Sequence, residues 1–541
     1  MRSKVKRALL TRRLAIIISL LATQLLWEAK AAGTTNINQP LFSITPAQPV
    51  LQLSVTKGSY VAGEAKSEGE FALCLANSGP VSSASHCVRQ LVPEQSGRAG
   101  FYFVASSDSP FIVSQSNHPV DITLLNVVAP EHQTQAMPGF VSPMVARAYQ
   151  TLQAGHLAEA VWRSLSQNGS PIIEPTSKPG ESLLTFIHKG AQFNALIFGA
   201  PDRDHGWMTR LGNSDIWFKT YTVPDSTVLS YQIAPDVPQF AGSPFEQRVA
   251  LKATAQRDPL NPRLTKPAST DPHFQFSMVA LPNAPTFESC VDACPLLGDI
   301  HQFSLTSAGL NNSRLISVYT SPTNQHPAPP IQVILFDGMQ FSSEVNVLAS
   351  LERAVLNNRI PALEVVLVDS LDNSTRAMEL PDNPQFTQML THELLPAVAS
   401  VTSRSFAAYN RVLAGASYGG LGAFTHALRA SDYFGNAVVM SGSFWWADRP
   451  DYPQDKYFIS ERVMASPMQS VRYAISAGLF ESSPTGQKGI LSGSRHLRDM
   501  LTLKGYEVYY REYAGGHDYT IWERALIDGL MSLFPVESNK G

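Results

Sequence analysis

Gly415-Ala416-Ser417-Tyr418-Gly419 has the form G-x-S-x-G and separates two segments of different pattern. Before it, residues 410–414 form a short apolar run of strand length, and after it residues 420–428 place apolar side chains at helical spacing. A nucleophile elbow has this setting, because its glycines allow a sharp turn and the amino terminus of the helix faces developing negative charge. The pattern therefore predicts that Ser417 is an exposed nucleophile, with a structural Gly-Ser turn as the alternative.

A serine nucleophile needs a base and an orienting acid, and in this fold they follow it in the order Ser, Asp or Glu, His. Near the end of the chain, residues 506–513 alternate like a strand and break at the glycine-rich loop 514–518, which contains His517. The sequence has thirteen histidines. His517 is the predicted base because it lies on a loop just past a strand end, with a surface or packing histidine as the alternative.

Several carboxylates are candidates for the acid. Residues 471–477 have the pattern of a buried strand, and Glu481 lies on the loop at its carboxyl end, so Glu481 is the predicted acid. Asp518 is badly placed to meet the far ring nitrogen of its own neighbour, Asp499 falls in a predicted helix, and Glu512 lies within a strand. A Ser-His dyad without an orienting carboxylate stays open.

Two backbone amides are expected to form the oxyanion hole. One is the amide of Tyr418, which follows the nucleophile, and the other should come from the loop after an earlier central strand. Residues 331–336 have the pattern of such a strand. Gly338 or Met339 would therefore give the second amide.

These residues resemble a known family, the enterochelin (ferric enterobactin) esterases of iron-siderophore metabolism. The resemblance covers roughly residues 140–535. Besides the elbow, the segments that carry it are 258–262 (DPLNP), 335–338 (LFDG), 376–381 (RAMELP), 393–396 (ELLP), 441–446 (SGSFWW), 477–481 (AGLFE) and 515–518 (GGHD) with Trp522. The catalytic segments are also similar to the wider esterase D group, which includes feruloyl and acetyl esterases, so they indicate the chemistry better than the substrate.

The substrate that the resemblance implies is a ferric catecholate siderophore, a trianion whose pocket needs fixed cations. Arg376 and Arg449 match arginines in the family's corresponding segments, and a surface or ion-paired arginine is the alternative for each. Trp445 and Trp446 directly follow a predicted strand. They would line the pocket for the catechol rings, or else pack in the core, which is where Trp522 is expected.

The beginning of the chain has the pattern of an export signal. Residues 2–13 are a basic n-region, 14–27 a short apolar h-region and 29–31 a cleavage pattern, so residues 1–31 are a predicted signal peptide. The apolar run is shorter than the ~20 residues of a membrane span, and the mature chain has no other candidate span. Paired arginines at 12–13 leave a twin-arginine route open beside ordinary secretion. We therefore expect a periplasmic or secreted product.

The charge of the mature chain bears on its partners. The whole sequence has a formal net charge of −3, and removing the predicted signal peptide takes away seven Lys/Arg and one Glu, which leaves 34 basic and 43 acidic side chains and a net charge of −9. A negative surface argues against nucleic acid and anionic membranes as partners. Attraction of an anionic substrate must therefore be local to the pocket.

The four cysteines form two local groups, Cys74 with Cys87 and Cys290 with Cys294. This even number is suited to two disulfides in an oxidising space, although pairing across the groups stays open. Neither group has the C-x-x-C spacing of a zinc knuckle, and no H-E-x-x-H occurs. No metal site is therefore predicted.

A chain of 541 residues with 44 % hydrophobic content should contain several domains. We expect an α/β fold with a carboxyl-terminal α/β-hydrolase, preceded by two small β-sandwich-like domains and the signal peptide. Alternating strands predict a β-sandwich over 36–130, two short helices a connector over 140–170, and further strands a β domain over 181–265 that resembles the family's amino-terminal domain. Strands alternating with helices predict the α/β-hydrolase over 285–535.

Together these features predict an exported serine esterase that acts on a small-molecule ester without a cofactor. The leading substrate is the lactone backbone of a catecholate siderophore such as ferric enterobactin, and the alternative enzyme is a broad-specificity acyl, feruloyl or acetyl esterase. A hypothesis of another class is a hydrolase scaffold that binds a siderophore or glycan without turnover. Acyl transfer to an acceptor other than water also stays open.

Overall fold

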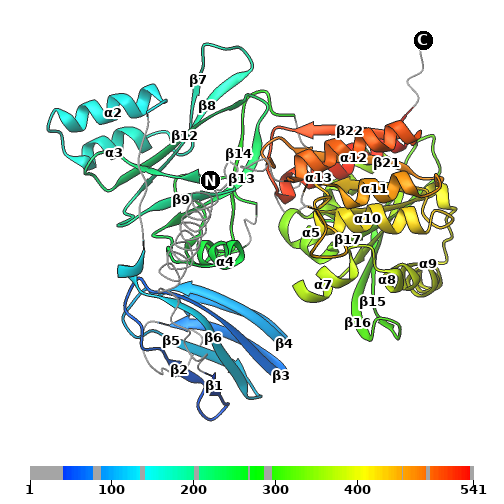
Figure 1. Ribbon diagram of the computed structural model, residues 1–541, viewed down its shortest axis with the longest axis horizontal. Helices are drawn as coiled ribbons and strands as arrows, with labels where there is room; N and C mark the ends of the chain where they lie inside the picture. The colour runs from blue at the N-terminus through cyan, green and yellow to red at the C-terminus, as the bar shows by residue number, and fades with distance from the viewer. Residues whose placement is uncertain are drawn as a thin grey trace, which may run out of the picture. The chain divides into compact units, whose positions relative to one another are not determined.

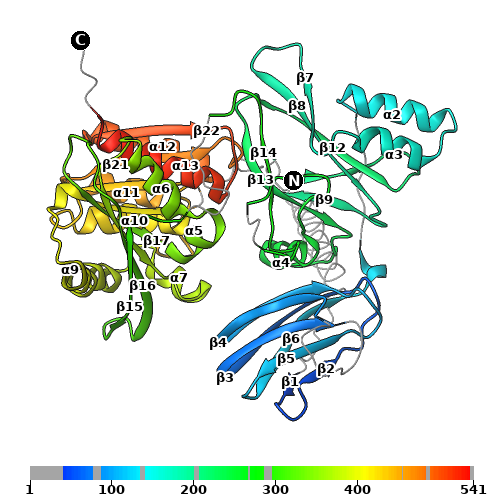
Figure 2. The same ribbon diagram turned by 180° about the vertical axis from the view of Figure 1, so that it is seen from behind.

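The computed structural model describes residues 41–76, 87–133, 140–199, 201, 206–265, 269–285, 295–453, 455–482 and 488–536. The predicted signal peptide, Cys290 and Cys294 lie outside these residues. Figures 1 and 2 show the elements from opposite sides. The chain divides into two compact units, one made of the first 135 residues with Asp236–Thr254 and the other of the rest.

The first unit is built on one bent sheet. Strand β3 is 17 residues long and pairs with β4 on one edge, while on the other edge its first half pairs with β6 and its second half with β5. Register shifts between Ser67 and Cys74 interrupt the pairing with β4, and such irregularities let a sheet bend around its core. The six strands in the region predicted as a β-sandwich form one sheet, because β3 is long enough to pair with both halves of it.

Helix α4 belongs to this unit although it comes much later in the sequence. Its Ala250 and Ala253 pack with Tyr60 and Val128 of the sheet, and the Arg89 guanidinium donates a hydrogen bond to the carbonyl oxygen of Ala253. The local disulfide between Cys74 and Cys87 is confirmed. The elements are β1 (Leu41–Ile44), β2 (Val50–Gln52), β3 (Tyr60–Ala76), β4 (Arg89–Val104), β5 (Phe111–Ser116), β6 (Val120–Val128), the 3-10 turn η2 (Pro130–His132) and α4 (Pro244–Thr254).

The second unit begins with a β domain of two four-stranded sheets, in the orders β10-β9-β13-β14 and β11-β12-β8-β7. Both sheets contribute to one apolar core, in which the rings of Phe186 on β8 and Tyr231 on β13 meet edge to face at 4.7 Å. The two predicted short helices are α2 and α3, which pack through Val145 and Val161 on this domain. The elements are α2 (Pro143–Gln153), α3 (Ala158–Ser166), β7 (Ile172–Pro175), β8 (Glu181–Lys189), β9 (Ala195–Phe198), β10 (Gly206–Trp207), β11 (Thr209–Arg210), β12 (Ile216–Pro224), β13 (Val228–Pro235) and β14 (Ser277–Ala280).

The rest of the second unit has the predicted α/β fold, an eight-stranded sheet in the order β15-β16-β18-β17-β19-β20-β21-β22. The strands from β18 to β22 run parallel, and β15 and β16 form an antiparallel hairpin at one edge. The strands predicted at 331–336 and 471–477 are β17 and β21. Because the central strands are covered on both faces, they read as continuous apolar runs rather than alternating ones.

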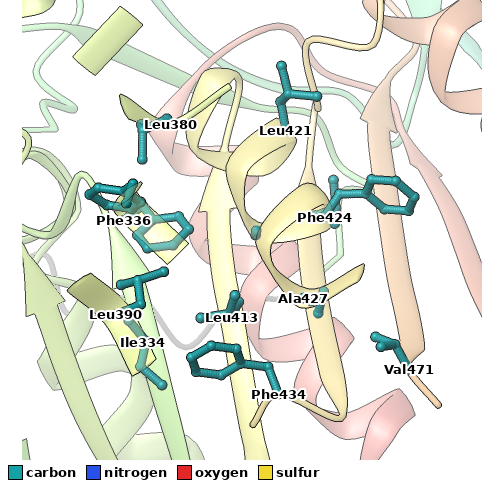
Figure 3. Close-up of a cluster of buried hydrophobic side chains, with 14 of the residues drawn as sticks. Ile334, Phe336, Leu380, Leu390, Leu413, Leu421, Phe424, Ala427, Phe434 and Val471 are labelled. Carbon is teal, nitrogen blue, oxygen red and sulfur yellow. The ribbon is translucent and has the colours of Figure 1, made fainter. Parts of the chain in front are cut away.

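Helices cover both faces of this sheet. On one face Leu421 and Phe424 of α10 belong to one apolar cluster with Leu390 and with Leu413 of β19 (Figure 3). On the other face α5, α6 and α13 contribute a second apolar cluster, which includes Phe341, Leu351 and Leu526. Sites in such sheets form at the carboxyl ends of the parallel strands.

The elements of this part are β15 (Asp299–Ser307), β16 (Asn312–Thr320), β17 (Ile331–Phe336), α5 (Gly338–Val345), α6 (Val347–Leu356), β18 (Leu363–Val368), α7 (Asn373–Glu379), α8 (Pro384–Gln388), the π-helical turn η3 (Met389–Leu394), α9 (Leu395–Thr402), η4 (Ala408–Asn410), β19 (Arg411–Ala416), α10 (Tyr418–Arg429), β20 (Asn436–Met440), α11 (Phe458–Ala465), β21 (Arg472–Gly478), α12 (Ile490–Lys504), β22 (Val508–Tyr513) and α13 (Tyr519–Leu533).

A buried carboxyl in α13 makes stability depend on pH. Glu523 is 2 % exposed and receives a hydrogen bond from the Ser350 hydroxyl of α6, and burial raises its pKa from 4.5 to about 8. A folded pKa above the unfolded one means that unfolding releases a proton between these values, so this group's contribution to stability falls as pH rises from 4.5 to about 8.

We therefore expect Glu523→Gln to stabilise the protein at pH 9 by on the order of a few kcal/mol, with little effect at pH 5. Thermal melts from pH 5 to pH 9 measure the difference, and Glu507→Gln, at an exposed position just before β22, is the control. Parallel curves for the parent and Glu523→Gln would contradict the assignment.

Candidate active site

Ser417 lies between β19 and α10, as the elbow pattern predicts. Its backbone has φ 57° and ψ −119°, a conformation that a non-glycine residue adopts only when its surroundings enforce it. The turn is tight, since a Cβ on Gly415 would lie 2.4 Å from the carbonyl oxygen of Gly419. A strained, partly exposed serine at a strand-to-helix turn is the geometry of a nucleophile elbow.

His517 and Glu481 meet at the same edge of the sheet. His517 follows β22 and Glu481 follows β21, and His517 Nδ1 lies 2.5 Å from Glu481 Oε1. The Glu481 side chain is 2 % exposed and that of His517 is 33 % exposed. A neutral imidazole that donates from Nδ1 keeps its Nε2 lone pair free to accept a proton.

The other oxygen of Glu481 is held by two donors that the sequence did not single out. Glu481 Oε2 accepts from the Ser441 hydroxyl at 2.8 Å and from the Gly478 amide at 2.6 Å, and Ser441 Oγ accepts in turn from Trp522 Nε1 at 2.9 Å. Trp522 also stands edge-on to the His517 ring, with centroids 4.7 Å apart. The carboxylate is therefore fixed on both sides, and Trp522 contacts both ends of the network.

The remaining carboxylates considered for the acid have other partners. Asp499 pairs with Arg498, and Glu512 accepts two hydrogen bonds from Arg495. Asp518 caps the amino terminus of α13. Among the described residues, Glu481 is thus the carboxylate placed on the imidazole.

Ser417 is hydrogen-bonded to Ser443, which lies two residues after Ser441 in the sequence. Ser417 Oγ lies 3.4 Å from Ser443 Oγ, and the Ser443 amide donates to the Ser417 carbonyl at 3.1 Å. Within the part of the chain that the structure describes, the Ser417 hydroxyl makes no hydrogen bond to His517. Such bonds are often long without substrate and tighten when the substrate binds.

The predicted oxyanion loop lies beside the elbow. Gly338 opens α5 directly after β17, and Asp337, with φ 55°, precedes it. The two loops touch, because a Cβ on Gly419 would lie 2.9 Å from Asp337 Oδ2. Met339 is 38 % exposed. The amides of Gly338 and Met339 thus belong to the first turn of α5, directly after the residue that borders the elbow.

Arg376 is engaged with this loop. Its Nε and Nη2 donate to the two oxygens of Asp337 at 2.7 and 2.6 Å, and Ser370 donates to Asp337 as well. Burial acts to lower the pKa of Arg376, but the hydrogen bonds and charge of Asp337 outweigh it and the pKa is raised. Its guanidinium carbon lies 5.7 Å from the Tyr418 ring centre. Ion pairing, the alternative reading of Arg376, is therefore present in the structure.

The other predicted substrate contacts differ in exposure. Trp445 is 44 % exposed and its ring lies 5.8 Å from that of Tyr418, next to the nucleophile. Trp446 instead packs against Phe458 and the sheet core. The Arg449 side chain is 61 % exposed and lies 3.7 Å from Asp451. Trp445 is thus placed at the site, whereas Trp446 has the core role given as its alternative.

Comparisons with known proteins agree with this geometry. A family model described as "Enterochelin esterase, N-terminal" matches residues 193–289, and one described as "Putative esterase" matches residues 307–533. The chain is 27 % identical to the iron(III) enterobactin esterase of Dickeya dadantii, over 72 % of this chain and 95 % of that protein. The predicted resemblance to the enterochelin esterases is confirmed.

Further proteins named as esterases of this kind match over similar lengths. The iron(III) salmochelin esterase of Escherichia coli is 28 % identical, over 71 % of this chain and 96 % of that protein. The ferric enterobactin esterase structure from Salmonella typhimurium matches with a TM-score of 0.57 and 25 % identity, covering 70 % of this chain and 98 % of that one. The Shigella flexneri enterobactin esterase in the presence of enterobactin matches with a TM-score of 0.56, 25 % identity and the same coverage.

No helix of the described residues is long and apolar enough to cross a bilayer. No three of their His, Cys, Asp or Glu side chains gather in a group that could hold a metal ion.

Removing the Ser441 hydroxyl should slow the reaction. A hydrogen bond to a charged group contributes roughly 1.5–3 kcal/mol, so we expect Ser441→Ala to lower kcat about ten- to a hundredfold with little change in KM. Steady-state kinetics on a short-chain nitrophenyl ester measure this. Ser494→Ala is the matched control, because Ser494 is a buried serine whose hydroxyl has no hydrogen-bond partner among the described residues. Equal kcat in the two variants would contradict the role of Ser441.

Proposed function

We propose that this protein is a serine esterase that hydrolyses the ester bonds of a ferric catecholate siderophore and so releases its iron. The observation that carries the chemistry is the His517–Glu481 hydrogen bond at 2.5 Å, at the same sheet edge as the strained Ser417. The substrate assignment is supported by the similar proteins, which are named iron(III) enterobactin and iron(III) salmochelin esterases. They match this chain over nearly their whole length.

The proposed reaction uses a serine, a histidine and a glutamate in turn. Ser417 Oγ attacks the ester carbonyl while His517 Nε2 takes its proton, and Glu481 stabilises the imidazolium that forms. The oxyanion accepts hydrogen bonds from the Tyr418 amide and from that of Gly338 or Met339. His517 then protonates the leaving alcohol, and a water activated by the same histidine releases the acid from the serine.

The rings beside Ser417 and two arginines of the same part of the chain are suited to an aromatic, anionic substrate. Trp445 and Tyr418 offer ring faces on which a catechol can stack. Arg449 offers an exposed cation, whereas Arg376 shares its charge with Asp337. We therefore assign the anion contact to Arg449 and a supporting role beside the oxyanion loop to Arg376.

We also propose that the protein acts outside the cytoplasm, in the periplasm or after secretion. The support is the signal-peptide pattern of residues 1–31 and the Cys74–Cys87 disulfide, since structural disulfides persist in oxidising compartments.

Time-resolved product analysis with iron-loaded enterobactin and a short-chain nitrophenyl ester tests the proposed reaction. We expect the parent protein to fragment the siderophore, and Ser417→Ala to lose at least about a thousandfold in kcat because the nucleophile is gone. Cleavage of the nitrophenyl ester alone would leave a broad-specificity esterase. Siderophore binding without turnover in the parent would instead indicate a binding scaffold.

The two arginines should behave differently when neutralised. Arg449→Gln should raise KM for the ferric siderophore several-fold and act mainly on that substrate, because the lost charge faces the anion. Arg376→Gln should lower kcat for both the siderophore and the nitrophenyl ester, because Asp337 beside the oxyanion loop loses its cation. Initial rates on both esters measure this, and the reverse pattern would exchange the two assignments.

A further inference from the structure

The loop that carries His517 is bonded to a strand of the β domain. Strand β13 pairs with β14 through its first residues, Val228–Tyr231, and with β9 through its last, Gln232–Pro235. On the edge of β13 that faces away from β14, β9 pairs only with the second half of the strand. The first half of that edge is bonded to the loop between β22 and α13. The Val228 amide donates to the Ala514 carbonyl at 3.0 Å, and the Ser230 amide donates to Asp518 Oδ2 at 2.8 Å.

These two donors hold the loop on either side of the histidine. Amides two residues apart on a strand point to the same edge, so Val228 and Ser230 act together. Their partners stand three residues before His517 and one residue after it. The backbone that carries the imidazole is thus fixed at both ends by the β domain.

Asp518 joins the β domain to α13 as well. Its Oδ1 accepts from the Thr520 and Ile521 amides at 2.7 and 3.4 Å and caps the helix, while its Oδ2 faces Ser230. Each oxygen therefore has a separate task. This division allows the bond to the β domain to be removed without removing the helix cap.

Close packing supports the same contact. A Cβ on Gly515 would lie 2.9 Å from the Val228 carbonyl oxygen and 2.5 Å from the Ile521 side chain, whereas a Cβ on Gly516 would meet nothing within 4 Å. On the neighbouring loop, Phe480, which directly precedes Glu481, packs against the apolar core of the β domain. The β domain thus contacts the residues that flank both members of the His517–Glu481 pair.

We propose that strand β13 is a positioning element for the catalytic histidine, and that Asp518 is the positioning residue through which it acts. This rests on the proposed role of His517 as the base. The β domain then contributes to the chemical step, since an imidazole displaced by about 1 Å can cost up to a hundredfold in rate. Esterase activity depends on a domain that holds neither the nucleophile nor the acid.

Asp518→Asn in the full-length protein tests this most directly. Asparagine is as good a helix cap as aspartate, but with its oxygen on the Thr520 amide its NH₂ group faces the Ser230 amide, so donor opposes donor. We expect kcat for a nitrophenyl ester to fall about ten- to a hundredfold with KM within about twofold. The ring ¹⁵N and ¹H signals of His517, assigned with His517→Asn, should shift or broaden.

A matched pair of glycine variants provides the second test. Gly515→Ala presses a methyl group on Val228 and should lower kcat, whereas Gly516→Ala, one residue along in the same loop, meets open space and should stay within about twofold of the parent. If Gly515→Ala does not fold, the kinetics and imidazole signals of Asp518→Asn alone test the role of β13. Parent-like kcat and unchanged imidazole signals in Asp518→Asn would overturn the proposal, as would equal losses in both glycine variants.

Failure of the proposed function gives a different result. If the parent protein cleaves only the nitrophenyl ester, the siderophore is not its substrate. The kinetic test of β13 can still be made with the nitrophenyl ester. A parent protein that cleaves neither ester would contradict the proposed esterase activity. The imidazole signals of parent, Asp518→Asn and Gly516→Ala then decide whether β13 fixes the position of the His517 ring: a shift confined to Asp518→Asn supports it, and its absence overturns it.

Discussion

The site depends on one constraint, the parallel order of the strands from β17 to β22. Parallel strands end at the same edge of a sheet, so loops that are far apart in the sequence meet there. The order of strands also sets the order of contacts: Glu481, after β21, lies between Ser441 after β20 and His517 after β22. Any change of strand order would separate these three side chains even if every residue were kept.

Much of the α/β part was predictable because its signals are local. A serine between two glycines after an apolar strand, and a histidine on a glycine loop, each follow from a few adjacent residues. Glu481 needed only one further step, its place after a buried strand. Ser441 was missed because a serine on a loop has no signature of its own, and its contact with Glu481 follows only from the order of β20 and β21 in the sheet.

Contacts between segments that are far apart in the sequence could not be predicted from local sequence patterns. The Ser230–Asp518 hydrogen bond joins residues 288 positions apart, and its donor is a backbone amide that any residue but proline would supply. The bent sheet of the first unit was also missed, because alternation predicts strands without saying that β3 serves two partners on one edge. Arg376 could be recognised as a candidate cation from the sequence. Its ion pair with Asp337 could not, because it depends on β17 and β18 being neighbours in the sheet.

Helix α4 sets a limit on how the protein can be divided. Its sequence lies inside the β domain, between the end of β13 and Ala255, whereas its Ala250 and Ala253 complete an apolar layer on β3 and β6. Cutting the chain after its first 135 residues would therefore leave α4 attached to the catalytic part and would expose the apolar residues of the sheet that α4 covers. The first unit is in this sense a non-contiguous domain, and a shortened enzyme would have to lose residues from two places in its gene.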